Sequence, residues 1–71
     1  MESRQIKLDQ INNAILLGRI AKIADKLRLP YQDTDLLETL KLHRADIQGS
    51  ASFNELMFGW LQGWDMQNLE M

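Results

Sequence analysis

The 71-residue chain contains no cysteine, one proline and one histidine. Without cysteine it can form no disulfide, no thiolate zinc site and no cysteine nucleophile. With His43 as the only imidazole, a nucleophile and base oriented by a third group would need less usual residues, so we interpret His43 as a partly exposed helix residue. We therefore expect no catalytic site, no cofactor and no metal ion.

Long hydrophobic runs are also missing from the sequence. The longest uninterrupted apolar run extends from Ala14 to Leu17, whereas about 20 residues are needed to cross a bilayer. The first residues, Met1 to Arg4, lack the apolar stretch of a secretory signal. The absence of cysteine fits a reducing compartment. We expect a cytoplasmic protein that makes no contact with a membrane.

Basic residues are missing from the last part of the chain. Residues 1–45 hold all eight Lys and Arg together with six acidic residues, whereas residues 46–71 hold four acidic residues and no basic one. The two parts have net charges of +2 and −4. Such asymmetry can orient association between proteins, but a net charge of +2 is too small for a typical nucleic-acid-binding domain.

The first part of the chain has helical spacing. Hydrophobic residues form 45% of the sequence, which is enough for one core. Those of the first part recur three or four positions apart, which indicates a helix: Leu8, Ile11 and Ile15, then Leu16, Ile20, Ile23 or Ala24, and Leu27. Gly18 costs about 1 kcal/mol relative to Ala in a helix. We therefore predict two helices, or one bent helix, meeting near Gly18 and ending before Pro30.

Another helix is predicted to follow and to end at Gly49 and Ser50. Oxygen atoms for its exposed first amides come from three residues: Asp33, Thr34 and Asp35. We interpret Asp33 and Asp35 as helix caps rather than as metal ligands or an acid/base pair. The apolar residues that point inward are Leu36, Leu37, Leu40 and Ile47.

A last helix begins at a capping box, in which Ser52 is followed three residues later by Glu55. Its apolar face contains Phe53, Met57, Trp60 and Trp64. The sequence therefore predicts an all-α fold, a small antiparallel bundle of four to six helices, in a single domain over residues 1–71. Five residues are expected to be buried: Ile23, Leu27, Leu40, Leu56 and Trp60.

Basic residues form a stripe on the second predicted helix. Arg19, Lys22 and Lys26 stand at i, i+3 and i+7, with Arg28 nearby. The stripe is interpreted either as a solvated face or as a surface that binds a protein partner or a second copy of the chain. Its acidic counterpart would be either Asp46, Glu55 and Asp65 on another copy or an equivalent acidic patch on a different protein. Two further residues are read as either core or contact surface, because exposed Trp and Met are enriched at interfaces: Trp64 and Met66.

From Gly18 to Trp60 the order of residues resembles that of a death domain. Family members often read Gly-x-Trp-x-x-Leu-Ala-x-x-Leu-x-Leu, and the matching residues here are Gly18, Ile20, Ile23, Ala24, Leu27 and Leu29, with Ile20 in place of the tryptophan. Later elements of the family are matched by Asp35, Leu37, Leu40, Leu56, Met57 and Trp60. The resemblance implies a six-helix antiparallel bundle with a non-catalytic adaptor function through oppositely charged helical surfaces. Residues 64–71 fall where the sixth helix would start, so either that helix is truncated or the chain is a different small bundle.

Two alternatives to the adaptor remain open at this point. A helix-turn-helix DNA-binding regulator could use Ile20 to Leu29 and Thr34 to Arg44 as its two helices. The acidic start of the candidate recognition helix argues against it, because phosphates would repel Asp33 and Asp35. A small helical protein that binds and inhibits another protein is the other alternative, and nothing in the sequence separates it from an adaptor.

Overall fold

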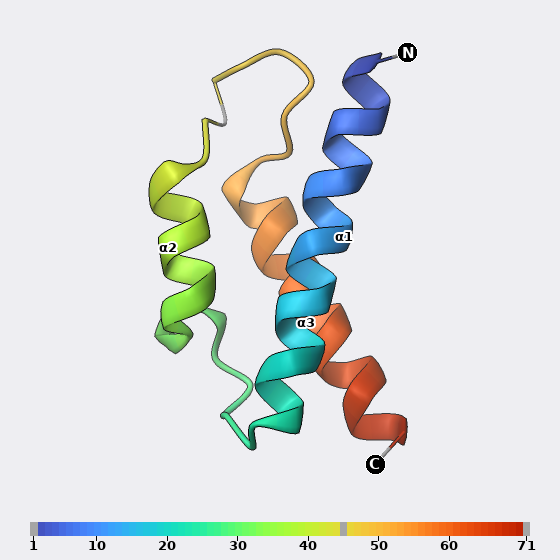
Figure 1. Ribbon diagram of the computed structural model, residues 1–71, viewed down its shortest axis with the longest axis vertical. Coiled ribbons are helices and arrows are strands. Elements are labelled where there is room, and N and C mark those ends of the chain that lie inside the picture. Colours follow the sequence, from blue (N-terminus) through green and yellow to red (C-terminus); the bar gives the residue numbers. More distant parts are fainter. Residues whose placement is uncertain (1, 45, 71) are drawn as a thin grey trace.

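The computed structural model describes residues 2–44 and 46–70, with side chains from Ile6 onward, and within these residues it is all-α. The elements follow the order α1 (Glu2–Ile23), the 3-10 turn η1 (Pro30–Gln32), α2 (Thr34–Leu42) and α3 (Phe53–Glu70) (Figure 1). The all-α prediction is confirmed. The predicted four to six helices are not confirmed, because the described residues form three α-helices and one 3-10 turn.

Helices α1 and α3 run parallel to each other, and α2 runs antiparallel beside them (Figure 1). Ion pairs set the direction: Lys7 contacts Glu55 near the start of both long helices, and Arg19 contacts Glu70 toward their ends. The predicted antiparallel packing thus describes α2 but not the pair α1 and α3. The molecule is thin, with principal dimensions of 36 × 22 × 14 Å, so a large fraction of its side chains lies at the surface.

The contact between α1 and α3 depends on small residues spaced four apart, which lie on one face of a helix. A Cβ atom added to Gly18 would overlap the carbonyl oxygen of Trp60, and one added to Gly63 would overlap the carbonyl oxygen of Ile15. At Gly59 the nearest atom to an added Cβ would be the Ile11 carbonyl oxygen, at 3.2 Å. The two backbones therefore touch at these glycines.

Of the two alternatives predicted near Gly18, two separate helices are wrong, because α1 continues through this residue without interruption. Glycine weakens a helix mainly by allowing other conformations, a cost of about 1 kcal/mol. In α1 the missing side chain lets the Trp60 backbone approach closely, and the helix continues through Gly18 beside α3.

The core consists of two adjoining clusters of small and large side chains. One contains Ala14, Ala51 and Leu56, and the other contains Ala21, Leu36 and Trp60. The predicted burial of Leu56 and Trp60 is confirmed, and Leu40 is partly buried against both clusters. The predicted burial of Ile23 and Leu27 is wrong, since these side chains are 61% and 69% exposed. The face of α1 that packs against the core carries Ala14, Gly18 and Ala21, so Ile23 lies on the outer side of the helix.

Helix α1 ends in a Schellman motif rather than at Pro30. The Lys26 N–H donates to the Ala21 carbonyl and the Asp25 N–H donates to the Lys22 carbonyl, both at 2.9 Å. Asp25 has a φ of 62°, the left-handed conformation that this motif requires. Pro30 begins η1 instead of ending a helix. The helix predicted over Ile20 to Leu29 for a helix-turn-helix therefore does not extend past Ile23.

The starts of α2 and α3 agree with the sequence analysis. Asp33 caps α2 by accepting a hydrogen bond from the Asp35 N–H at 3.1 Å. Ser52 and Glu55 form the predicted capping box at α3, because each side chain accepts from the other residue's N–H, at 3.1 and 2.9 Å. Helix α2 ends at Leu42, seven residues before Gly49, so Ile47 lies outside it and is exposed.

The segment between α2 and α3 is tied to both long helices. His43 follows the last residue of α2, and its Nε2 atom lies 2.6 Å from the Ala51 carbonyl oxygen. The Ala51 N–H donates to the Gln10 side chain of α1 at 2.7 Å, while the His43 ring meets Phe53 edge-on. The half-buried histidine thus holds the loop in place.

Candidate protein-binding surface

Two of the four predicted basic residues pair with acids of α3. Arg28 donates from Nε and Nη2 to the two carboxylate oxygens of Asp65, at 2.7 and 2.8 Å. Arg19 donates from Nη2 to Glu70 at 2.6 Å. The hydrogen bonds with Asp65 raise the pKa of Arg28, and those with Arg28 lower the pKa of Asp65. Both cations therefore fasten the end of α1 and the turn after it to α3.

The third basic residue, Lys22, lies over the ring of Trp64. Its Nζ atom is 4.9 Å from the ring centroid, a cation–π distance. The indole N–H of Trp64 donates to the Lys26 carbonyl oxygen at 3.0 Å. Trp64 is therefore a half-buried side chain fixed against the end of α1, while Met66 on the same helix is 46% exposed. The structure brings Lys22 and Trp64 together and leaves Met66 at the surface.

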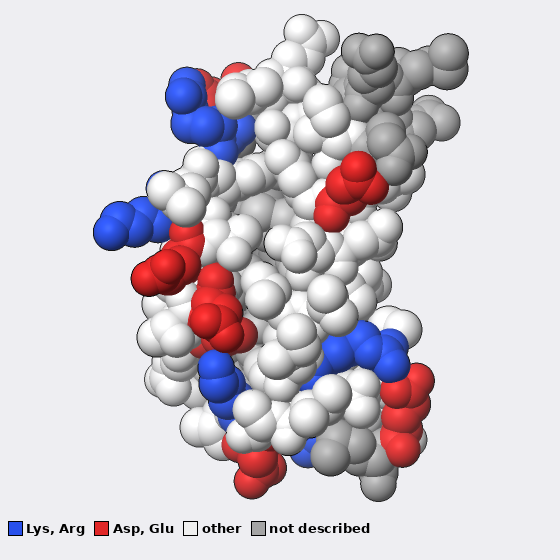
Figure 2. Space-filling model, viewed as in Figure 1, with Lys and Arg blue, Asp and Glu red and all other residues white. Residues whose placement is uncertain are grey.

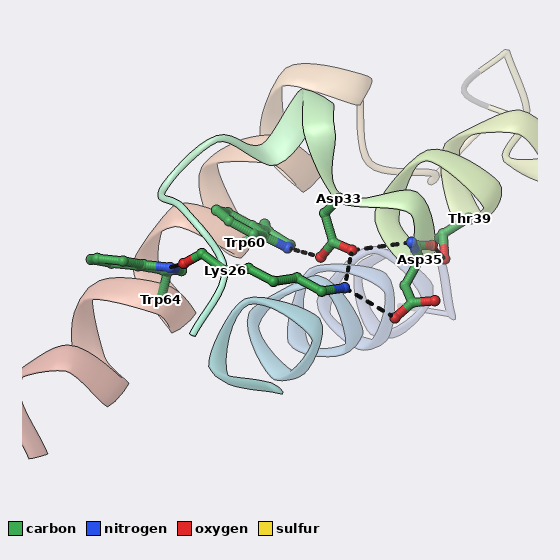
Figure 3. Close-up of polar contacts among 6 residues, drawn as sticks. All are labelled: Lys26, Asp33, Asp35, Thr39, Trp60 and Trp64. Carbon is green, nitrogen blue, oxygen red and sulfur yellow. Dashed lines mark hydrogen bonds and ion pairs between the residues drawn. The ribbon is translucent and has the colours of Figure 1, made fainter. Parts of the chain in front are cut away.

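The fourth basic residue, Lys26, joins a polar cluster around the buried carboxylate of Asp33, which is 3% exposed (Figure 3). One oxygen of Asp33 accepts from the indole N–H of Trp60 at 2.6 Å. The other accepts from the Asp35 N–H and lies 3.3 Å from Lys26 Nζ. Since each carboxylate oxygen has a partner, the cluster connects the start of α2 to α3 and acts as a structural support.

The acidic residues predicted to face another copy also pair within the chain. Asp46 accepts two hydrogen bonds from Arg44, at 3.0 and 3.1 Å, and Glu55 contacts Lys7 at 2.8 Å. Hydrogen bonds from these bases lower the pKa values of Asp46 and Glu55. With Asp65 held by Arg28, each of the three acids already has a basic partner in its own chain.

A hollow of about 340 Å³ lies between the end of α1 and the start of α2, lined in part by Lys26, Leu27 and Asp33. Its charged residues are Lys26 and Asp33 of the polar cluster together with Asp25. In the described part of the chain, no three His, Asp or Glu side chains gather as metal ligands would. None of the described helices combines the length and the apolar composition needed to cross a membrane.

Large aliphatic side chains gather on the face of α1 opposite α3. We call them the α1 seam: Ile6, Leu16, Ile20 and Ile23. Their exposed fractions lie between 45% and 61%. In Figure 1 α1 passes in front of α3, and in the same view Figure 2 shows uncharged side chains over much of the middle of the molecule, with charged ones mostly toward its edges. The seam was not among the predicted binding residues.

No family model, no curated protein and no solved structure matches the chain. The surface must therefore be interpreted from its own chemistry. The sequence carries two signals for this surface: the four-residue spacing of Gly59 and Gly63, which is typical of a close helix contact, and the 16, 20, 23 spacing of aliphatic residues, which is typical of a buried helix face and of a helix-binding face alike.

Proposed function

We propose that this chain is a non-catalytic domain that binds another protein through the α1 seam. The observation that carries the proposal is the exposure of three aliphatic side chains in register on one helix face: Leu16 at 53%, Ile20 at 46% and Ile23 at 61%. Single exposed aliphatic residues are normal at protein surfaces, but aligned apolar rows are typical of contact sites.

The support under the seam makes it suitable for binding. Helix α1 is held from behind by α3 through Gly18, Gly59 and Gly63, so its outer residues have a fixed spacing before any partner arrives. Preorganised residues lose less conformational freedom on association. Positions i, i+4 and i+7 of a helix are also the usual anchors when a helix packs into a groove or against another helix.

This proposal keeps the kind of function that the resemblance to death domains implies, which is adaptor-type protein binding, but it moves the contact from charges to aliphatic residues. Arg19 and Arg28 are ion-paired within the chain, and such pairs would have to exchange partners for a charge-based contact. The same pairing argues against DNA binding, since counterion release requires cations available to phosphates. An inhibitor of another protein would use the α1 seam in the same way as an adaptor.

The test compares the proteins captured by the wild-type chain with those captured by two variants. In each variant one exposed aliphatic residue is replaced by glutamate. Ile20→Glu introduces a charge into the seam, and Leu42→Glu introduces one at the exposed end of α2, where the side chain is 81% exposed. Both variants should keep the helical circular dichroism spectrum of the wild type. Quantitative mass spectrometry of proteins retained from the native source should find partners bound by wild type and Leu42→Glu but lost with Ile20→Glu. Equal retention by all three chains would refute the α1 seam as the binding surface.

A further inference from the structure

We propose that the partner of the α1 seam is a second copy of this chain, with the two α1 helices parallel and in register as a short two-stranded coiled coil. The inference rests on the proposed function, since it names the partner of the same surface. It follows from the order of residues along the outer row of α1, from the side chains beside that row and from its polar members.

The outer row of α1 follows a heptad pattern. Its positions alternate steps of three and four residues, and all six side chains are exposed: Ile6, Asp9, Asn13, Leu16, Ile20 and Ile23. In heptad terms Ile6, Asn13 and Ile20 occupy a positions. The d positions hold Asp9, Leu16 and Ile23. Isoleucine at a with leucine at d, the combination of Ile20 and Leu16, favours two parallel strands. The row needs a continuous helix, and α1 supplies 22 residues, or about 33 Å.

Asn13 identifies the second copy as the partner. An amide carries both donors and acceptors, so Asn13 can pair with Asn13 of a second copy when the two helices are parallel and in register. Against an aliphatic partner the same amide would lose water without gaining a hydrogen bond. A single asparagine at an a position among aliphatic residues is the established device for fixing register and two-stranded assembly.

The side chains beside the seam permit this approach without repulsion between like charges. On one flank Arg19 is neutralised by Glu70 of its own chain at 2.6 Å. On the other flank stand Leu17 and Ala24, which carry no charge. Helix α3 contacts the opposite face of α1, so a second α1 helix can pack on the seam without displacing it.

The size of the contact sets its expected strength. A helix about 10–12 Å wide and about 33 Å long covers on the order of 350 Å² per copy, below the roughly 800 Å² per partner of a standard interface. We therefore expect a weak dimer, with a dissociation constant between about 10 µM and 1 mM. Asp9 weakens it further, because it places a polar side chain instead of an aliphatic one at a d position.

Sedimentation equilibrium of the whole chain up to about 1 mM tests the association. Wild type and Leu42→Glu should dimerise equally, whereas Ile20→Glu should raise the dissociation constant at least tenfold. A monomer at 1 mM, or equal dissociation constants for Ile20→Glu and wild type, would overturn the proposal.

The absence of cysteine allows a separate test of register. A single Ile6→Cys thiol, which leaves Asn13 in place, should form an inter-chain disulfide under mild oxidation much faster than a Leu42→Cys thiol. Equal rates would overturn the parallel in-register arrangement even if a dimer forms. A monomeric chain whose seam-dependent partner is another protein would refute self-pairing and leave the proposed function standing. A monomeric chain that also has no seam-dependent protein partner would refute both self-pairing and the proposed function.

Discussion

The two long faces of α1 differ in the side chains at their centre: the inner face has small residues there, with Ile11 and Leu17 partly buried beside them, and the outer face has large aliphatic residues. The face toward α3 and α2 includes Ala14 and Ala21, each 1% exposed, with Gly18 between them. The opposite face carries Leu16, Ile20 and Ile23, which are about half exposed. Hydrophobicity alone would place the aliphatic residues inside. Close backbone contact with α3 requires small residues, so side-chain size decides which face of α1 is buried.

The largest expected effect comes from adding one methyl group to the small-residue face. Gly18→Ala should destabilise the fold by about 3 kcal/mol or more, although alanine favours helix by about 1 kcal/mol, because the new Cβ would overlap the Trp60 backbone. Gly59→Ala is the matched control: its Cβ would be 3.2 Å from the nearest atom, so its net effect should be within about 1 kcal/mol. Urea unfolding measures both. Equal losses for the two variants would show that the close contact at Gly18 is not decisive.

Removing the carboxylate that holds Trp60 should have the next largest effect. Asp33→Ala removes the cap of α2 and leaves the buried indole N–H of Trp60 without its acceptor, for a combined loss of about 2–3 kcal/mol. Asp33→Asn keeps an oxygen for the cap and should lose less. Thermal unfolding with Trp fluorescence as the probe tests this. An Asp33→Ala variant as stable as wild type would contradict the supporting role of the cluster.

The end of α1 offers a stabilising change. Asp25 is held at a φ of 62°, which costs a residue with a Cβ more than it costs glycine. Asp25→Gly should raise stability by about 0.5 kcal/mol, with part of the gain offset by the greater freedom of glycine in the unfolded chain. Asp25→Ala, which keeps the Cβ, should not stabilise. A lower melting temperature for the glycine variant would indicate that the carboxylate itself stabilises the turn.

Truncating an outward aliphatic residue should change stability little. Leu27 was expected in the core, where Leu27→Ala would cost about 2–5 kcal/mol, but at 69% exposure the cost should be within about 0.5 kcal/mol. Leu56→Ala, at a 2% exposed position, should show the full core cost. Comparing the two variants by urea unfolding tests the assignment of faces directly. Similar losses for both would place Leu27 in the core after all.

How far the sequence predicted the structure depends on the range of each interaction. Local signals worked: the Ser52 and Glu55 capping box, the Asp33 cap and the all-α fold follow from short spacings in the chain. The buried face of α1 could not be predicted in this way, because Gly18 allows two interpretations. A glycine weakens an isolated helix, but it also allows a second helix to approach closely. Only the position of α3, about 40 residues later, decides between them.

The candidate surface was predicted less well for the same reason. The basic stripe was predicted on one helix, but α1 ends at Ile23, before Lys26 and Arg28. The partners of Arg28 and Arg19, Asp65 and Glu70, lie 37 and 51 residues away along the chain. No local pattern reveals that these acids neutralise Arg28 and Arg19. The α1 seam became recognisable only when its aliphatic residues proved to be exposed, since the same spacing also describes a buried helix face.

The smallest expected effect concerns the ion pair that joins the turn after α1 to α3. Arg28 lowers the pKa of Asp65 in the folded chain, mainly by hydrogen bonding, whereas the unfolded chain has the ordinary pKa of an aspartate. The pair therefore contributes stability above about pH 4, and this contribution is lost as the pH falls through the lower folded pKa. Because both groups are exposed, the contribution is small and screened by salt.

Arg28→Gln should make the acid decline in urea midpoint between pH 6 and pH 2 slightly shallower than in wild type. The decline should not vanish, since Glu55 and Asp46 keep their own basic partners. The difference between the two chains should disappear in about 1 M salt, where screening acts over about 3 Å. Identical curves at low salt would mean that the pair with Asp65 contributes nothing measurable to folding, and that other contacts between α1 and α3, such as those at the glycines and around Trp60, hold the two helices together.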